Sequence, residues 1–146
     1  MLNHVEPGGV YMNVKLLTEY QSLRKEIVEL QERIKEVRRA ACYPTSPQLT
    51  GMPRAPGYSN DGIARIFEQI EELTELYTTK QIRLNDLCLQ IESEIDQLPS
   101  FERRIIRLRY LDDKFWPEIS EIMNVSVSQL HRIHKKIFAE FKNDAP

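Results

Sequence analysis

The sequence predicts an all-α protein in which two long helices form a coiled-coil hairpin and a three-helix helix-turn-helix domain follows. Apolar residues recur at spacings of four and three over two long segments, which is the signature of a coiled coil. The chain contains only 5 Gly and 8 Pro, and half of the Pro falls between those two segments. We therefore expect a loose lead-in over 1–12, a hairpin over 13–98 with its loop at 43–60, and the helix-turn-helix domain over 99–146.

The first long segment carries a heptad stripe over three repeats. Its members are Leu16, Tyr20, Leu23, Ile27, Leu30, Ile34 and Val37. The residues between them are mostly charged, as expected on the solvent-facing side of a helix. Four prolines and two glycines follow in residues 43–60, so the helix is expected to end near Cys42.

The second long segment, residues 61–97, continues the same periodicity. Its stripe consists of Ile63, Ile66, Ile70, Leu73, Tyr77, Lys80, Leu84, Leu87 and Ile91, and after Glu94 it resumes at Ile95 and Leu98. Lys80 and Glu94 are polar residues at seam positions, where they cost stability but fix the register. Ile82 and Leu89 lie seven residues apart on another face. They indicate a second surface to bury, against a partner subunit or against the C-terminal domain.

Two heptad helices joined by a loop most simply fold back as an antiparallel hairpin. Pairing Cys42 with about Gly62 sets the register of that hairpin. Cys88 then lies opposite about Leu16, roughly 39 Å from Cys42 along the axis at a rise of 1.5 Å per residue. The two cysteines are too far apart for an intrachain disulfide in this arrangement.

A parallel dimer through the first helix is the alternative. Ile27 and Ile34 would occupy the a positions, with Leu23 and Leu30 at d, and this pattern favours two-stranded parallel coils. The sequence does not decide between the two arrangements, which can coexist if hairpins pair into a bundle.

The last third of the chain shows a succession of helix starts and stops. Pro99 interrupts the long helix, and Ser100 is suited to cap a helix from Phe101 to about Leu111. A turn at residues 112–114 leads to a short helix with Pro117 at its first position, where the missing N–H costs nothing.

A tight turn at Asn124 and Val125 separates this short helix from the last one. Ser126 is expected to cap the last helix, and Gln129 completes the capping-box pattern S-x-x-Q. The helix should run to about Phe141 on a core stripe of Leu130, Ile133 (or His134), Ile137 and Phe141. A short helix, a tight turn and a capped longer helix make a helix-turn-helix.

In such units the N-terminal turns of the second helix enter the major groove of DNA. The residues of the last helix that lie off its core stripe are the candidate DNA-binding residues: Ser126, Val127, Ser128, Gln129, His131, Arg132, Lys135 and Lys136. Gln side chains pair with adenine edges and Arg side chains with guanine edges. Lys135, Lys136 and His131 suit phosphates, which position a protein without reading sequence.

Charge distribution agrees with this placement. The net charge is −2, but residues 1–98 carry 11 basic and 15 acidic residues, and residues 99–146 carry 9 basic and 7 acidic residues. Any DNA contact should therefore come from the C-terminal part. Arg103, Arg104, Arg107 and Arg109 are expected to make the preceding helix basic as well.

No catalytic or cofactor-binding pattern accompanies this unit. The sequence has no phosphate-binding loop, no nucleophile paired with a base and no cluster of metal ligands, so we expect no enzyme activity, no cofactor and no metal. His131 and His134 lie three residues apart but lack a third ligand. No apolar run is long enough to span a membrane and no secretory signal begins the chain, so a cytoplasmic location is expected.

The C-terminal residues resemble region four of sigma factors. The likeness rests on Leu98-Pro99, Glu102-Arg103, Ile106, Arg109-Tyr110, Trp116, Glu118-Ile119, Met123, Val125-Ser126, Leu130 and Arg132-Ile133-His134-Lys135. A closer resemblance is to small phage and prophage regulators of late transcription, of the ArpU-like and RinA-like kind. The loop sequence Gly51-Met52-Pro53-Arg54 also resembles a signature in that group, so the likeness covers most of the chain.

This resemblance implies a sequence-specific DNA-binding regulator that activates phage genes from double-stranded promoter DNA and contacts host RNA polymerase in the bacterial cytoplasm. The sequence departs from the family pattern at Phe115, which stands where a small polar cap is expected before Trp116. The coiled coil implies a homodimer or higher oligomer. Two other functions stay open: a DNA-packaging protein of the small-terminase kind, and a sigma mimic that binds polymerase without DNA.

Overall fold

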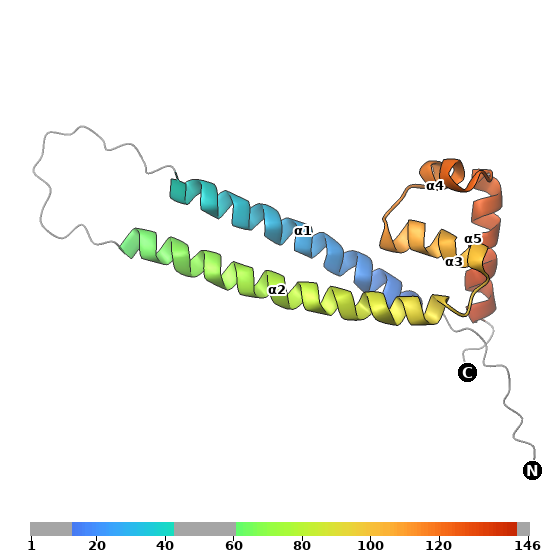
Figure 1. The fold of residues 1–146 in the computed structure, drawn as a ribbon, viewed down its shortest axis with the longest axis horizontal. Helices are drawn as coiled ribbons and strands as arrows, with labels where there is room; N and C mark the ends of the chain where they lie inside the picture. Colours follow the sequence, from blue (N-terminus) through green and yellow to red (C-terminus); the bar gives the residue numbers. More distant parts are fainter. Residues whose placement is uncertain (1–12, 43–60, 143–146) are drawn as a thin grey trace, which may run out of the picture. The chain divides into compact units, whose positions relative to one another are not determined.

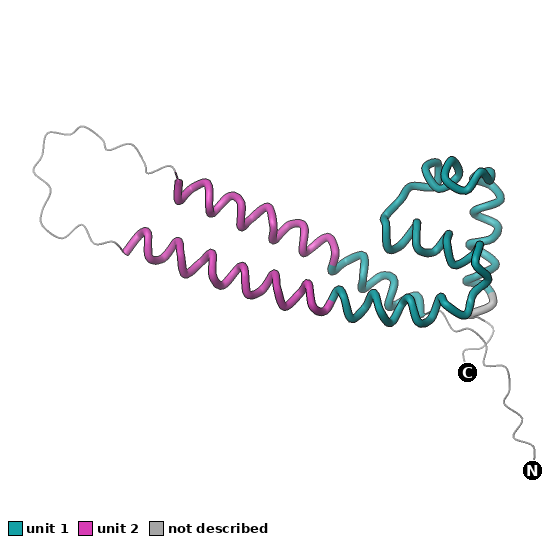
Figure 2. The backbone as a smooth tube through the Cα atoms, viewed as in Figure 1, with its two compact units in different colours: residues 1–23, 84–146 teal, residues 24–83 magenta. Residues whose placement is uncertain are grey.

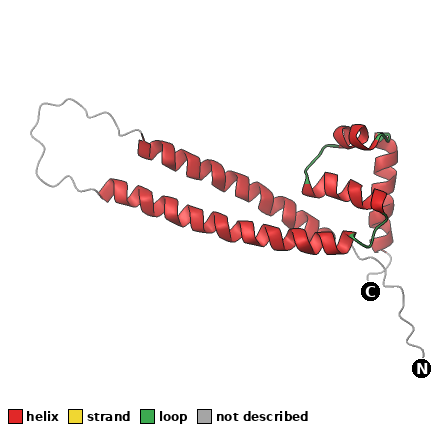
Figure 3. Cartoon of the chain, viewed as in Figure 1, coloured by secondary structure: helices red, strands yellow, loops and turns green. Residues whose placement is uncertain are grey.

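A computed structural model describes residues 13–42 and 61–142, with the side chains of the last helix described to residue 139. Every regular element within these ranges is helical (Figures 1 and 3). The elements are α1 (Val14–Cys42), α2 (Asp61–Ile95), α3 (Ser100–Ile106), the π-helical turn η1 (Arg107–Leu111), α4 (Trp116–Met123) and α5 (Val127–Lys142). The predicted all-α class, with two long helices packed together and shorter helices after them, is confirmed.

The chain forms two compact units, coloured separately in Figure 2. Unit 1 contains residues up to Leu23 and from Leu84 onward, and unit 2 contains Arg24–Arg83. Each unit therefore holds a part of both long helices. The expected division of the chain at residue 98 stays a prediction. The expected lead-in, the expected loop and its Gly51–Arg54 sequence lie outside the described residues.

Unit 2 is an antiparallel pair formed by the C-terminal part of α1 and the N-terminal part of α2. The Lys80 ammonium donates to the Glu26 carboxylate over 2.6 Å, and the Gln31 amide donates to the Tyr77 hydroxyl over 2.9 Å. The polar seam residue Lys80 thus joins the two helices directly. The antiparallel alternative is the arrangement found within the chain.

These contacts also correct the expected register. Pairing Cys42 with Gly62 would place Glu26 opposite Thr78, two residues before its observed partner. The side chains along the seam, and not the ends of the helices, set the pairing. Both cysteines are free.

Unit 1 buries the remaining parts of the two stripes. Fully or nearly fully buried side chains are Leu17, Tyr20 and Leu23 from α1, Leu84, Leu87, Ile91 and Ile95 from α2, and Leu98 after it. Leu17 is 2% exposed, whereas Leu16, the expected first member of the stripe, is only half-buried. Asn13 caps α1, since its side chain accepts from the Lys15 N–H over 3.0 Å.

The second polar seam residue, Glu94, has a specific role in unit 1. Its carboxylate accepts the backbone N–H of Asn13 over 2.8 Å. This bond ties the start of α1 to the last turns of α2, so a carboxylate at an otherwise apolar position fixes the antiparallel pairing at this end.

The chain leaves α2 through Leu98 and begins α3 with a different cap from the one expected. Pro99 is the N-cap residue, with φ −52° and ψ 146°, and Ser100 is already helical. The Pro99 carbonyl accepts from the Arg103 N–H over 2.9 Å. Proline suits this position because its fixed φ matches the required backbone and its missing N–H is not needed.

The helix after Pro99 is not a continuous α-helix to Leu111. Its last turn, η1, is a π-helix in which the Asp112 N–H donates to the Arg107 carbonyl, five residues earlier, over 2.9 Å. None of the described helices is long and apolar enough to cross a membrane.

Candidate nucleic-acid interface

The helix-turn-helix is built around three fully buried side chains, one from each of its helices. Ile105 of α3, Ile119 of α4 and Leu130 of α5 are each 0% exposed and form one cluster. Half-buried apolar side chains pack around it, namely Leu108, Trp116, Met123, Val125 and Ile133. Because each helix contributes to the same cluster, the orientation of α5 depends on all three.

The turn between α4 and α5 is held by Ser120. Its hydroxyl donates to the Val125 carbonyl over 2.6 Å, and its own carbonyl accepts from the N–H groups of Asn124 and Val125. Asn124 adopts the left-handed conformation, with φ 54° and ψ 46°. Asn tolerates this conformation better than most residues, and the predicted tight turn at this position is confirmed.

Ser126 caps α5 as predicted. Its hydroxyl oxygen accepts from the Gln129 N–H over 3.2 Å, and its carbonyl accepts from the Leu130 N–H. The reciprocal half of the expected capping box differs. The Gln129 side chain contacts the Ser126 hydroxyl, at 3.4 Å, instead of the Ser126 backbone.

The start of α4 shows how this helix is capped although Phe115 stands where a small polar residue was expected. This residue is the N-cap and has no side-chain acceptor to offer the helix. The Glu118 carboxylate reaches back and accepts the Phe115 N–H over 2.7 Å. One half of a capping box therefore suffices here, and Pro117 occupies the second helical position instead of the first.

Seven of the eight predicted DNA-binding residues are exposed, and Val127 is half-buried. Those seven are Ser126, Ser128, Gln129, His131, Arg132, Lys135 and Lys136. Leu130 and Ile137 occupy the opposite, buried side of α5. The structure therefore gathers the predicted residues on one outward surface of the first three turns of this helix.

Two members of this surface also have partners within the chain. The Lys136 ammonium lies 3.9 Å from the Glu102 carboxylate while its side chain stays 65% exposed. The His131 ring lies 4.7 Å from the Trp116 ring, between centroids. Their engagement leaves Arg132 and Lys135 as the cations most available to an outside ligand.

Behind this surface, His134 is the centre of an aromatic cluster that sequence reasoning placed only as a core alternative. Its Nε2 lies 2.7 Å from the Tyr110 hydroxyl. The rings of Tyr110, Trp116 and Phe138 lie 4.6–5.9 Å from it, between centroids. Burial lowers the pKa of His134, and the positive charges of His131 and Arg109 lower it further.

The arginines of α3 and η1 do not form the basic surface that the sequence suggested. Arg103 pairs with Asp96, and Arg107 makes bonds of 2.9 and 3.0 Å to both carboxylate oxygens of Glu92. Arg109 donates to the Lys114 carbonyl over 2.9 Å and lies 5.2 Å from the centre of the Trp116 ring.

Of the four arginines, only Arg104 is exposed, and the other three are half-buried. The positive charge of this helix serves mainly to attach it to neighbouring elements within unit 1.

The geometry is that of a helix-turn-helix, and comparison with known proteins agrees. Residues 88–133 match the family model of sigma-70 region 4. Region 4 is a DNA-binding, transcription-related helix-turn-helix and not a catalytic domain. The match begins within α2, spans α3 to α4 and ends within the second turn of α5. Neither a curated protein nor a solved structure matches the chain.

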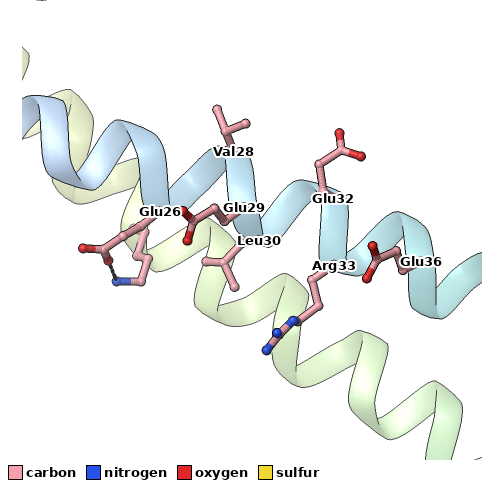
Figure 4. A pocket seen from close by; sticks show the side chains of 8 residues that line it. Glu26, Val28, Glu29, Leu30, Glu32, Arg33 and Glu36 are labelled. Carbon is pink, nitrogen blue, oxygen red and sulfur yellow. Dashed lines mark hydrogen bonds and ion pairs between the residues drawn. The ribbon is translucent and has the colours of Figure 1, made fainter.

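A groove on α1 in unit 2 is a different kind of site. It encloses about 600 Å³ and is lined by Glu26, Val28, Glu29, Leu30, Glu32, Arg33, Glu36 and Lys80. Figure 4 shows its four glutamates distributed along the helix. Four carboxylates against two cations would repel phosphates, so this groove is unsuited to nucleic acid.

Proposed function

We propose that this protein is a sequence-specific DNA-binding regulator that activates phage genes, with α5 as its recognition helix. The observation that supports this most is the exposed surface of α5, which carries Arg132 and Lys135 on a helix fixed by a tight turn and a shared core. The match of the surrounding residues to sigma-70 region 4 agrees with it. The proposal extends to contact with RNA polymerase and to action in the bacterial cytoplasm.

In this proposal the residues of α5 have separate roles. Arg132 reads a guanine edge, and Ser128 and Gln129 contact bases one turn earlier. Lys135, Lys136 and His131 bind phosphates and set the position of the helix. The side chains of Ser126 and Val127 mainly position the start of the helix, because one caps it and the other is half-buried.

Selection of binding sites from a random duplex library by the purified chain tests this function. We expect a recurrent sequence. Arg132→Ala should weaken binding to it by about 1–3 kcal/mol and relax the preference at one base pair. Lys25→Ala, which removes an exposed cation from unit 2, is the matched control and should select the same sequence. An Arg132→Ala variant that selects the wild-type sequence with equal affinity would refute the recognition-helix assignment.

A polymerase-binding protein without DNA affinity is the second candidate. The internal pairing of Arg103 and Arg107 favours it, because this pairing reduces the positive charge available to DNA. Capture of host RNA polymerase by a chain that selects no sequence and binds no duplex at low salt would establish this candidate and refute the first.

A further inference from the structure

The part of α2 in unit 2 leaves its apolar side chains largely uncovered. The buried residues of α2 begin only at Leu84, so none of the residues 61–83 is buried. Ile63 is 58% exposed and Phe67 is 62% exposed. An apolar stripe on a helix spans at least about 100° of its circumference, and one neighbouring helix covers only one side of such a stripe. Unit 2 therefore has apolar surface left to bury.

The side chains that are exposed or only half-buried follow a second heptad series along one flank of α2, which shares Ile63, Ile70 and Tyr77 with the first stripe. Its members are Ile63, Phe67, Ile70, Thr74 and Tyr77, at spacings of four, three, four and three. The polar members of the series already have partners. The Thr74 hydroxyl donates to the Ile70 carbonyl over 2.7 Å, and the Tyr77 hydroxyl accepts from Gln31. This set of five, the lateral face, can be buried without leaving an unsatisfied hydroxyl.

The two margins of the lateral face carry opposite charges. On the side of α1, Lys35 and Arg38 line a groove of about 310 Å³ together with Gln31, Ile34, Thr74 and Tyr77, and no carboxylate lines it. The Lys35 ammonium also pairs with Glu32 over 2.6 Å, but its side chain stays 56% exposed. On the other side, helical periodicity places Glu71 and Glu75 next to the face, and both are exposed.

We propose that the lateral face is a dimer interface, paired in parallel with the same face of a second copy about a two-fold axis that runs along the helices. This rotation places the basic margin of each copy beside the acidic margin of the other. It leaves the height of every residue along the helix axis unchanged. It brings Lys35 and Arg38 of one copy to Glu71 and Glu75 of the other. An antiparallel pairing would bring like margins together, which costs free energy. The surface is thus self-complementary, as an isologous interface must be, and its existence does not depend on DNA binding.

Sedimentation of the full chain tests the interface itself. The wild-type chain should have the mass of a dimer, and Phe67→Glu should have the mass of a monomer with an unchanged helical circular dichroism spectrum. Ile82→Glu places the same charge at a residue of unit 2 that is 58% exposed but lies off the lateral face, so it should stay dimeric. A monomeric wild-type chain, or a Phe67→Glu chain that remains a dimer, would overturn the proposal.

Cross-linking tests the parallel direction. In a chain with Cys42→Ser and Cys88→Ser, either Ile63→Cys or Thr74→Cys is introduced and the protein is oxidised. A parallel seam brings both positions close to their own copies, so both variants should form disulfide-linked dimers. In an antiparallel seam, a residue lies close to the same residue of the other copy only near the centre of the seam. Linkage of Thr74→Cys without Ile63→Cys, or of neither, would refute the parallel interface. Ile82→Cys is the control and should not link.

The charged margins can be tested by exchange. Lys35→Glu with Arg38→Glu should weaken the dimer, and adding Glu71→Lys and Glu75→Lys to the same chain should restore it. Recovery is expected because each reversed margin again meets its opposite on the other copy. A fourfold variant no stronger than the double variant would refute the assigned contacts.

Discussion

At the scale of the residue, Ser126 joins the turn of the helix-turn-helix to the start of α5. It supplies the only side-chain acceptor described for the first N–H groups of that helix. Ser126→Ala should lower the free energy of unfolding by about 1 kcal/mol, measured by chemical denaturation. Ser128→Ala, two residues into the helix and exposed, is the control and should change stability by less than about 0.5 kcal/mol. Equal effects of the two variants would contradict the assigned cap.

His134 gives the helix-turn-helix a pH dependence of known sign. Its imidazole has a lowered pKa because burial disfavours the charged form. As the pH falls below the ordinary value of about 6.5, the unfolded chain takes up a proton before the folded one does. The free energy of unfolding therefore decreases with falling pH, until the folded-state pKa is passed.

Thermal or chemical unfolding between neutral and mildly acidic pH tests this dependence. His134→Gln should remove the contribution of His134 to the slope of the free energy of unfolding against pH. Tyr110→Phe should lower stability at every pH, by about 1 kcal/mol, but keep the slope, because the imidazole is still present. A slope that survives in His134→Gln would assign the dependence to another group.

At the scale of the element, α3 and η1 are attached to the end of α2 by ion pairs. The Arg107 and Glu92 side chains are 42% and 34% exposed, so solvent screening limits the pair to about 1 kcal/mol or less. Arg107→Ala should therefore reduce stability slightly and leave the salt dependence of DNA binding unchanged. Lys135→Ala should reduce the salt slope by about 1. Fluorescence anisotropy at several salt concentrations distinguishes the two. A reduced slope in Arg107→Ala would mean that this arginine binds phosphate.

Local sequence signals predicted the elements well where one residue type dictates the backbone. The left-handed turn at Asn124 and the cap at Ser126 are such positions. Signals that depend on the partner across space were less informative. The choice between Leu16 and Leu17 at the seam is set by packing between helices. The π-helical turn at 107–111 has no sequence signature that we recognise, and Pro99 took the capping role expected of Ser100.

At the scale of the whole molecule, few cations remain for DNA. Arg132, Lys135 and Lys136 are the exposed Lys and Arg side chains of α5 up to residue 139, and the net charge of the chain is −2. If Lys135 and Lys136 bind phosphates while Arg132 reads a base, the logarithm of the affinity should fall with the logarithm of the salt concentration with a slope of about −2 per chain. Titration of a duplex at several salt concentrations measures this slope. A value near −8 would require phosphate contacts from elements other than α5.

The sequence indicated the class of fold and the candidate DNA-binding surface, but it overestimated the positive charge available around that surface. Counting Arg103, Arg107 and Arg109 as available cations failed because their acidic or aromatic partners, such as Glu92 and Trp116, are distant enough in sequence that only the fold reveals them. The exposure of seven of the eight predicted residues was predictable because a single helical period separates the buried side of α5 from its outer side, and their contact with DNA stays a prediction.

The π-helical turn makes the length of the chain, and not only its composition, a determinant of how α5 is braced. A π turn holds about one residue more than an α-helical turn. If the segment kept its length but closed as an ordinary α-helix, every later side chain on it would rotate by about 100°. Tyr110 would then no longer meet His134. In related chains, a one-residue gap in this segment would mark proteins in which it closes as an ordinary α-helix and keeps the later side chains in the same orientation.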